Sequence, residues 1–152
     1  MQEPSLFAVA KLLEIGLMNL DRVEIYWRPL TNHLLEVCRH PHIRMREWGS
    51  EAITFLVRSA LLHEDTEEEK VNQLLLSPLC ELSSIPHNDV RNKQLMALSQ
   101  ILHCKGEKLQ SSWPLAINIV GDIYENHRFA IFNTCLYWNI NCKDFKFNQV
   151  IN

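Results

Sequence analysis

The chain has 152 residues, of which 47% are apolar and 22% are charged, and these fractions are ordinary for a globular protein. Four glycines and six prolines are too few for a turn-rich all-β fold, and a net charge of −3 argues against a nucleic-acid-binding protein. Five cysteines without a C-x-x-C pair suit reduced thiols in a cytosolic protein rather than a disulfide framework. We therefore expect a cytosolic, helix-rich chain that buries one core.

The first apolar pattern of the chain is helical. Five residues recur at spacings of three or four, as on one face of a helix: Leu6, Val9, Ala10, Leu13 and Leu17. The opening segment lacks the basic residues of a signal peptide, so we expect none. No apolar run reaches the roughly 18 residues of a membrane span, so we expect no transmembrane helix.

Prolines divide the next part of the chain into two expected helices. Pro29 suits the first turn of a helix, and Pro41 ends that helix. Its apolar face comprises Leu30, Leu34, Val37 and Cys38. A longer helix is expected over residues 42–62, with its buried face formed by Trp48, Ala52, Phe55, Leu56 and Leu62.

The acidic run HEDTEEEK comes next, and it reads as a solvated helix start in preference to a cation site. Thr66 and Glu69 have the spacing of a capping box. Ser77-Pro78 predicts another helix start, and further helices are expected over residues 88–104 and from Trp113-Pro114 to about residue 124. These elements predict an all-α chain.

The chain contains an internal repeat. A shift of 45 residues places PHIRMREWGSEAITFLV (41–57) on PHNDVRNKQLMALSQIL (86–102). The identical pairs are Pro41/Pro86, His42/His87, Arg46/Arg91 and Ala52/Ala97. Each unit reads as a short helix, a helix begun by proline and a longer helix, and this period is typical of armadillo and HEAT repeats. We therefore predict an α-solenoid segment of two to three repeats over residues 1–124.

Two histidines and nearby groups raise the question of a metal site. His33, Cys38, His40 and His42 are close in sequence, and zinc needs three or four such ligands. The second Cys or His pair of a zinc motif is missing, and His42 has a repeat counterpart, His87, that a metal site does not require. We expect no metal and no other cofactor here.

The same stretch carries a basic cluster. Arg39, Arg44 and Arg46 could bind phosphates, but acidic residues are interspersed. Because Arg46 and Arg91 occupy one repeat position, we favour pairing with carbonyls or carboxylates at the turns of adjacent units. Nucleic acid is therefore not an expected partner.

Catalytic groups are also weakly indicated. Cys104 and His103 are adjacent and point apart on a helix, and no Gly-rich phosphate loop or nucleophile-elbow motif occurs. Three tryptophans could stack on a ligand but are more often packing residues: Trp27, Trp48 and Trp113. We predict no catalytic, cofactor-binding or metal-ligating residue, and partner-binding residues cannot be assigned from the pattern.

The tracts WRPLTNHLLEVC, HPHIRMREWGSEA and SWPL, with LLLSPL and DVRNKQL between them, resemble the large Golgi Arf-exchange-factor family. The resemblance covers about residues 6–122 and is closest to the family's relatives that lack the catalytic exchange domain. It implies a long α-solenoid that works as a non-enzymatic scaffold in Golgi-to-endosome vesicle traffic and protein transport. It also implies Dopey-type proteins and Arf-like GTPases as partners, and peripheral membrane association at the trans-Golgi network and endosomes through the full-length protein.

Two other functions stay open as alternatives. A nuclear-transport or phosphatase scaffold would fit the repeat without the resemblance, and part of an Arf exchange factor would fit the family. Residues 125–152 depart from the helical pattern, and we expect a divergent, poorly ordered tail there. Because the family's proteins are much longer, we also expect an internal fragment or a short isoform.

Overall fold

The computed structural model describes residues 5–63 and 69–124, and every regular element within them is helical. The elements are α1 (Phe7–Leu17), η1 (Leu20–Arg22), α2 (Val23–Cys38), α3 (Ile43–Leu62), α4 (Glu69–Leu82), α5 (Asn88–Lys105), η2 (Gly106–Ser112) and α6 (Trp113–Tyr124). The predicted all-α fold is confirmed. The Thr66 cap and the tail over residues 125–152 lie outside the described residues.

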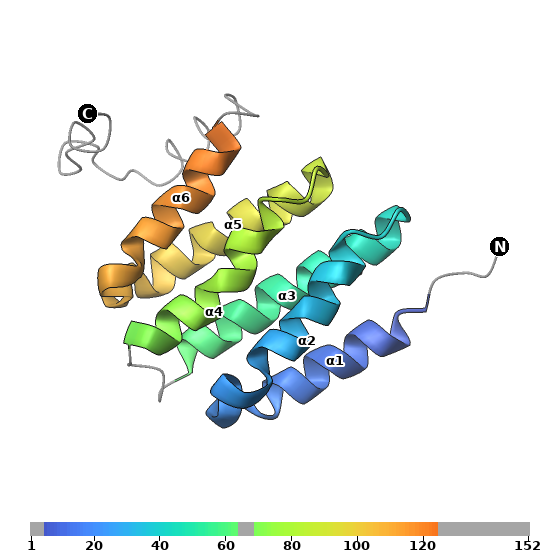
Figure 1. Cartoon of the computed structure of the whole chain (residues 1–152), viewed down its shortest axis with the longest axis horizontal. Coiled ribbons are helices and arrows are strands. Elements are labelled where there is room, and N and C mark those ends of the chain that lie inside the picture. The colour runs from blue at the N-terminus through green and yellow to red at the C-terminus, as the bar shows by residue number, and fades with distance from the viewer. Residues whose placement is uncertain (1–4, 64–68, 125–152) are drawn as a thin grey trace.

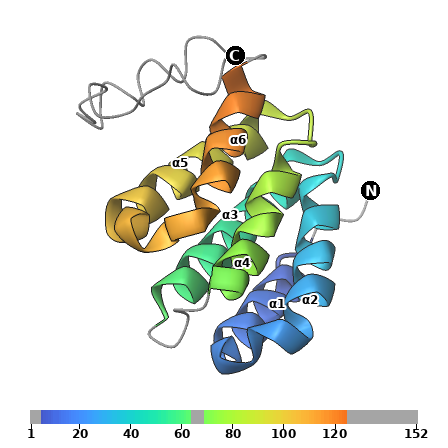
Figure 2. The same cartoon turned by 60° about the vertical axis from the view of Figure 1, so that its left-hand side comes forward.

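The helices form two layers. Helices α1, α3 and α5 lie side by side in one layer, and α2, α4 and α6 lie side by side in the other (Figures 1 and 2). Consecutive helices α2 and α3 form one pair across the layers, and α4 and α5 form the next. Helix α1 therefore occupies the place of a second helix and α6 that of a first helix, as expected for a stack of repeated helix pairs. The predicted solenoid segment is confirmed.

The prediction that new helices begin at Pro29 and Pro78 is wrong, because both prolines lie inside continuous helices, α2 and α4. Each repeat thus has two helices instead of the expected three. A proline has no N–H, so the carbonyl four residues before it loses its helical hydrogen bond. In α4 the Ser77 hydroxyl donates to that carbonyl, Leu74 O, at 2.8 Å. The serine predicted as a helix cap thus compensates for an internal proline.

The third proline behaves as predicted. Pro114 lies in the first turn of α6, where a missing N–H costs nothing because the first N–H groups of a helix have no intrahelical partner. The 3-10 helix η2 precedes α6 directly. Pro29 and Pro78 lie inside continuous helices, whereas the corresponding Pro114 lies at the boundary between two helical segments, η2 and α6.

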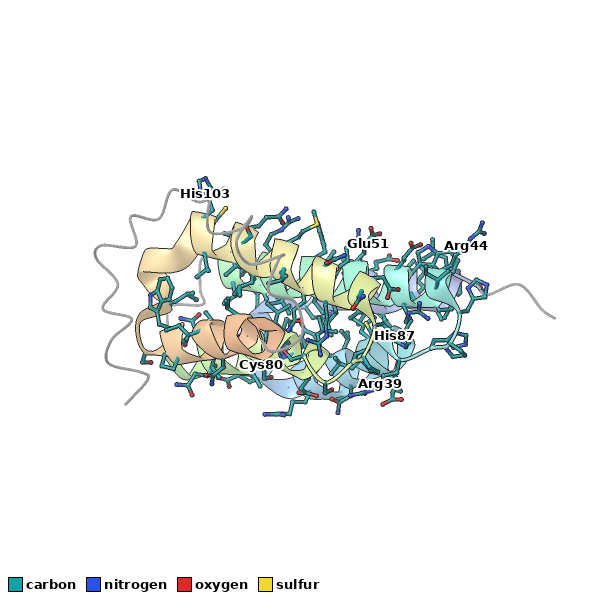
Figure 3. The ribbon with its side chains drawn as sticks, turned by 90° about the horizontal axis from the view of Figure 1, so that it is seen from above. Arg39, Arg44, Glu51, Cys80, His87 and His103 are labelled. Atoms are coloured by element: carbon teal, nitrogen blue, oxygen red, sulfur yellow. The ribbon has the colours of Figure 1, made fainter. Side chains whose placement is uncertain are left out.

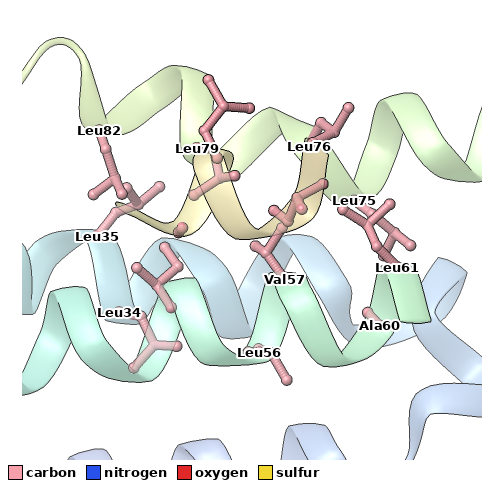
Figure 4. Packing of buried hydrophobic residues seen from close by; sticks show 14 of the residues in the cluster. Leu34, Leu35, Leu56, Val57, Ala60, Leu61, Leu75, Leu76, Leu79 and Leu82 are labelled. Atoms are coloured by element: carbon pink, nitrogen blue, oxygen red, sulfur yellow. The ribbon is translucent and has the colours of Figure 1, made fainter. Parts of the chain in front are cut away.

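The core lies between the layers, and leucines from both sides meet there (Figure 4). Trp27 of α2 is completely buried among them. The fully buried aliphatic side chains include Leu34, Leu35, Ile53, Leu56, Leu75, Leu76, Leu79 and Leu82. Burial of each such side chain contributes roughly 1.5–3 kcal/mol, so this interface supplies most of the stabilisation of the fold.

The predicted buried face of α3 is partly wrong. Ala52 and Leu56 are buried, but Phe55 and Leu62 are each 42% exposed and Trp48 is only half-buried. Helix α3 packs against α1 and α5 in its own layer and against α2 and α4 in the other. Apolar residues therefore surround most of this helix, so helical spacing alone does not identify the exposed side.

None of the helices within the described residues is both long and apolar enough to cross a bilayer.

Two glycines in helices have opposite surroundings. A Cβ atom on Gly49 would lie 3.1 Å from the Cys38 backbone nitrogen and 2.9 Å from Val37 Cγ1, so α3 approaches the end of α2 closely there. A Cβ on Gly121 would meet nothing within 4 Å. The first glycine is required by packing, and the second is not.

We therefore expect Gly49→Ala and Gly121→Ala to change stability in opposite directions. Gly49→Ala gains helix propensity but overpacks the contact with backbone atoms, for a net loss of about 1–2 kcal/mol. Gly121→Ala should raise stability by up to about 1 kcal/mol. Urea unfolding of both variants measures the two changes, and equal effects would contradict the close approach at Gly49.

Candidate functional site

The two histidines of the HPH stretch form the start of α3. His42 is the N-cap residue, and its Nδ1 accepts a hydrogen bond from the Arg44 N–H at 3.2 Å. His40 Nδ1 accepts from the His42 N–H at 3.0 Å. Both Nδ1 lone pairs are thus used within the turn. His87 is likewise the N-cap residue of α5, so the predicted matching positions of His42 and His87 are confirmed.

No cluster of three or more His, Cys, Asp or Glu side chains within residues 5–63 and 69–124 could hold a metal ion. His33 is exposed on α2, whereas Cys38 is buried at the end of that helix. The ligands considered from the sequence are therefore not brought together by the fold.

Arg46 joins two helix pairs. Its Nε donates to Asp89 Oδ2 of α5 at 2.9 Å, and its Nη1 donates to the carbonyls of His40 and Pro41 at 3.2 and 2.8 Å. The Arg46 side chain is 11% exposed and that of Asp89 is 25% exposed, so water screens this ion pair weakly. The arginine closes the turn of its own pair and fixes the next pair beside it.

Arg91 likewise closes the turn of the second repeat, where its Nη2 donates to the Ser83 carbonyl at 2.8 Å. Arg46 thus binds a carboxylate of the adjacent unit as predicted, whereas Arg91 binds a carbonyl at the turn of its own unit. Arg39 pairs with Glu36 on α2, while Arg44 lies on α3 in the other layer (Figure 3). The basic cluster seen in the sequence is divided between two layers and does not form one surface.

The repeat position shared by Gly49 and Gln94 is occupied by different kinds of residue in the two copies. Where the first repeat has Gly49, the second has Gln94, which is completely buried. The Gln94 side-chain Nε2 donates to the Leu79 carbonyl at 2.5 Å and to Ser83 Oγ at 2.8 Å. Close helix contact in one repeat is replaced by buried hydrogen bonds in the other.

The buried Cys38 and the half-buried Tyr26 have raised pKa values. Burial raises the pKa of the Cys38 thiol to about 12; Arg39 lowers it and Asp89 raises it to lesser extents. Burial, with a smaller effect of Asp21, raises the pKa of Tyr26 to about 12, and its hydroxyl donates to the Gly16 carbonyl at 2.8 Å. Both groups stay neutral at physiological pH, so Cys38 is a packing residue and not a nucleophile.

The remaining aromatic and thiol candidates are separated in the fold. Trp27 lies in the core, as predicted for a packing residue, whereas Trp48 and Trp113 are half-buried on different layers. Cys104 and His103 are both exposed at the end of α5. These groups do not converge on a common site.

A groove on the outer side of the α1–α3–α5 layer was not predicted. It has a volume of about 650 Å³. We call it the outer groove, and its lining residues are Leu6, Val9, Ala10, Leu13, Trp48, Glu51, Ala52, Thr54, Phe55, Arg58, Lys93, Met96, Ala97 and Gln100. Figure 3 shows Glu51 on this side of the molecule, away from Cys80 and Arg39.

The repeat pattern hides the outer groove, because its exposed residues differ between copies. Under the 45-residue shift, Glu51 falls on Met96 and Phe55 falls on Gln100. Phe55 also satisfies the helical spacing of core residues, which placed it wrongly in the interior. The one clue to this groove in the sequence is that the chain has more large apolar residues than the core accommodates.

Comparison with known proteins gives a consistent set of relatives. Residues 60–137 match the Mon2/Sec7/BIG1-like HDS family. The chain is 56% identical to the Protein MON2 homolog of Drosophila melanogaster over 137 residues, which is 88% of this chain and 8% of the relative. It is 55% identical to the Xenopus laevis homolog over 126 residues and 50% identical to the Homo sapiens homolog over 137 residues. No solved structure matches the chain.

The two-layer stack of helix pairs defines this protein as a segment of an α-solenoid. Arg46, Arg91 and the histidines at the start of α3 are structural parts of that stack, and the outer groove is a surface of mixed apolar and charged character. By the match over residues 60–137, the chain belongs to the Mon2/Sec7/BIG1-like family. It spans about 8% of the length of the curated relatives it matches.

The weakly screened Arg46–Asp89 pair should show measurable coupling. We expect a double-mutant cycle of Arg46→Ala and Asp89→Ala to give an interaction energy of about 1 kcal/mol. The exposed pair Arg39–Glu36 is the matched control and should give under about 0.5 kcal/mol. Denaturant unfolding of the six variants provides both values, and an interaction energy for Arg46–Asp89 no larger than that of the control would contradict its role between repeats.

Thiol reactivity should separate Cys38 from Cys104. At pH 8 we expect iodoacetamide to label Cys104 rapidly and Cys38 only after unfolding, because burial keeps the Cys38 thiol protonated. The raised pKa also implies that stability falls as pH rises from about 9 towards 12, since the unfolded thiol ionises first. Peptide mapping after labelling, with and without guanidinium, measures the difference; rapid native labelling of Cys38 would show that it is accessible.

Proposed function

We propose that this chain is a non-enzymatic scaffold segment that acts in vesicle traffic and protein transport between the Golgi and endosomes. The observation that carries the proposal is membership of the Mon2/Sec7/BIG1-like family, with high identity to proteins named as MON2 homologs. The geometry supports a scaffold because the polar side chains of Arg46, Arg91 and Gln94 serve the helix stack. Solenoids use such stacked pairs to present extended binding surfaces.

The proposed place of action is the cytoplasmic side of the trans-Golgi network and endosomes, through peripheral association of the full-length protein. The proposed partners are proteins, namely Arf-like GTPases and Dopey-type proteins. This part of the proposal rests on the family resemblance of the sequence, and it assigns no partner contact to a particular residue.

Microscopy of the full-length tagged protein tests the location. We expect it to coincide with trans-Golgi and endosomal markers, and binding assays with purified Arf-like GTPases should detect a complex without faster nucleotide release. Uniform nuclear staining together with co-purification of transport cargo would favour a nuclear-transport scaffold. Co-purification of a phosphatase catalytic subunit would favour a phosphatase scaffold. Accelerated nucleotide release would favour an exchange factor.

A further inference from the structure

We infer that the outer groove is a docking site for an amphipathic α-helix of a partner protein, with apolar anchor residues and an acidic residue beside them. The inference deepens the proposed scaffold function, on which it rests only in expecting a protein partner. It names the secondary structure and the charge of the segment that this surface accepts.

The first observation is the concentration of exposed apolar side chains along the outer groove. Phe55 of α3 is 42% exposed, Met96 of α5 is 58% exposed and Leu6 beside α1 is 46% exposed. Half-buried Trp48 extends the apolar surface along α3. Single exposed apolar residues are normal, but several around one hollow are characteristic of an interaction site.

The second observation is the charge of the outer groove. Two cations, Arg58 and Lys93, and one anion, Glu51, line it, so it carries a net charge of +1. Lys93 forms an ion pair with Glu51 across α3 and α5. Arg58 instead donates to the amide oxygen of Gln100 and lies 5.1 Å from the centroid of the Phe55 ring.

Arg58 is thus held in place by neutral partners. Among the described residues that line the groove, it is the cation without a carboxylate partner. The amide and the ring fix the position of the guanidinium without neutralising it. A carboxylate on the docked segment would complete the pairing, and Arg is well suited to bind one with two parallel hydrogen bonds.

The third observation concerns the shape of the segment. Trp48, Ala52 and Phe55 follow one another at spacings of four and three residues along α3. This spacing extends over about 10 Å, which equals the distance between anchors at i and i+7 on a docked helix. Residues 5–63 and 69–124 contain no strand whose edge could pair with an extended peptide. The groove therefore suits a helix.

Three labelled peptides of equal length test the inference with the full 152-residue chain. The first has leucines at i, i+3, i+4 and i+7 with glutamates beside them; the second has lysines in place of the glutamates; the third is a scrambled version of the first. We expect fluorescence anisotropy to show binding of the acidic peptide at least about tenfold tighter than binding of the other two.

Protein variants locate the binding surface. Phe55→Ser and Met96→Ser should each weaken binding of the acidic peptide about tenfold, and Arg58→Glu should reverse the preference between acidic and basic peptides. Ile117→Ser is the matched control, because Ile117 is an exposed apolar residue of α6 in the other layer. Circular dichroism verifies the fold of each variant, and the peptide charge swap tests Arg58 on the unchanged protein.

Several results would overturn the inference. Equal affinity for acidic and basic peptides would show that Arg58 does not select the charge of the peptide. Peptide binding that Phe55→Ser leaves unchanged would place the binding site outside the outer groove. Self-association that Met96→Ser abolishes would identify a second copy as the occupant. Binding to phosphatidylserine vesicles without peptide binding would indicate a lipid contact. Purified components suffice throughout, so a failure here leaves the Golgi location untouched, and the reverse also holds.

Discussion

The packing of α3 on four other helices is the constraint on which the rest of the structure depends. It contacts α1 and α5 within its layer and α2 and α4 across the core. Such a position requires small side chains where helices approach closely, and Gly49 and Ala52 provide them. On α1 the corresponding contact is at Gly16, where an added Cβ would lie 2.8 Å from Leu56 Cδ1. Without these close approaches the two layers could not enclose a continuous core.

Polar interactions set the register of the stack, whereas apolar burial drives its formation. Arg46 spans one turn and reaches Asp89 of the next pair, and Gln94 of α5 binds the Leu79 carbonyl of α4 and the Ser83 hydroxyl of the turn after α4. Each of these groups would be costly to leave unpaired in the interior. Sliding one helix pair against another would break the Arg46–Asp89 ion pair, so this interaction opposes alternative packings of the stack. The bonds of Gln94 instead hold α5 against α4 within one pair.

Much of the fold follows from sequence reasoning, because helix ends and repeats have local causes. The boundaries of α3, α5 and α6 agree with expectation, and so does the equivalence of His42 and His87. The errors at Pro29 and Pro78 arise because proline disfavours a helix locally while tertiary burial of α2 and α4 maintains it. The error at Phe55 has a different cause: an exposed apolar residue that lines the outer groove has the same helical spacing as a core residue.

Comparison of the two repeats therefore distinguishes residues required for helix stacking from residues that form the outer groove. Arg46 and Arg91, and Ala52 and Ala97, are identical because each pair of helices must stack in the same way. The outer groove combines Trp48, Glu51 and Phe55 from one copy with Lys93, Met96 and Gln100 from the other. A surface made of unlike residues from two copies is not repeated by the side chains of either copy alone within residues 5–63 and 69–124. A ligand of the outer groove would therefore recognise one place in this segment, even though the core beneath it repeats.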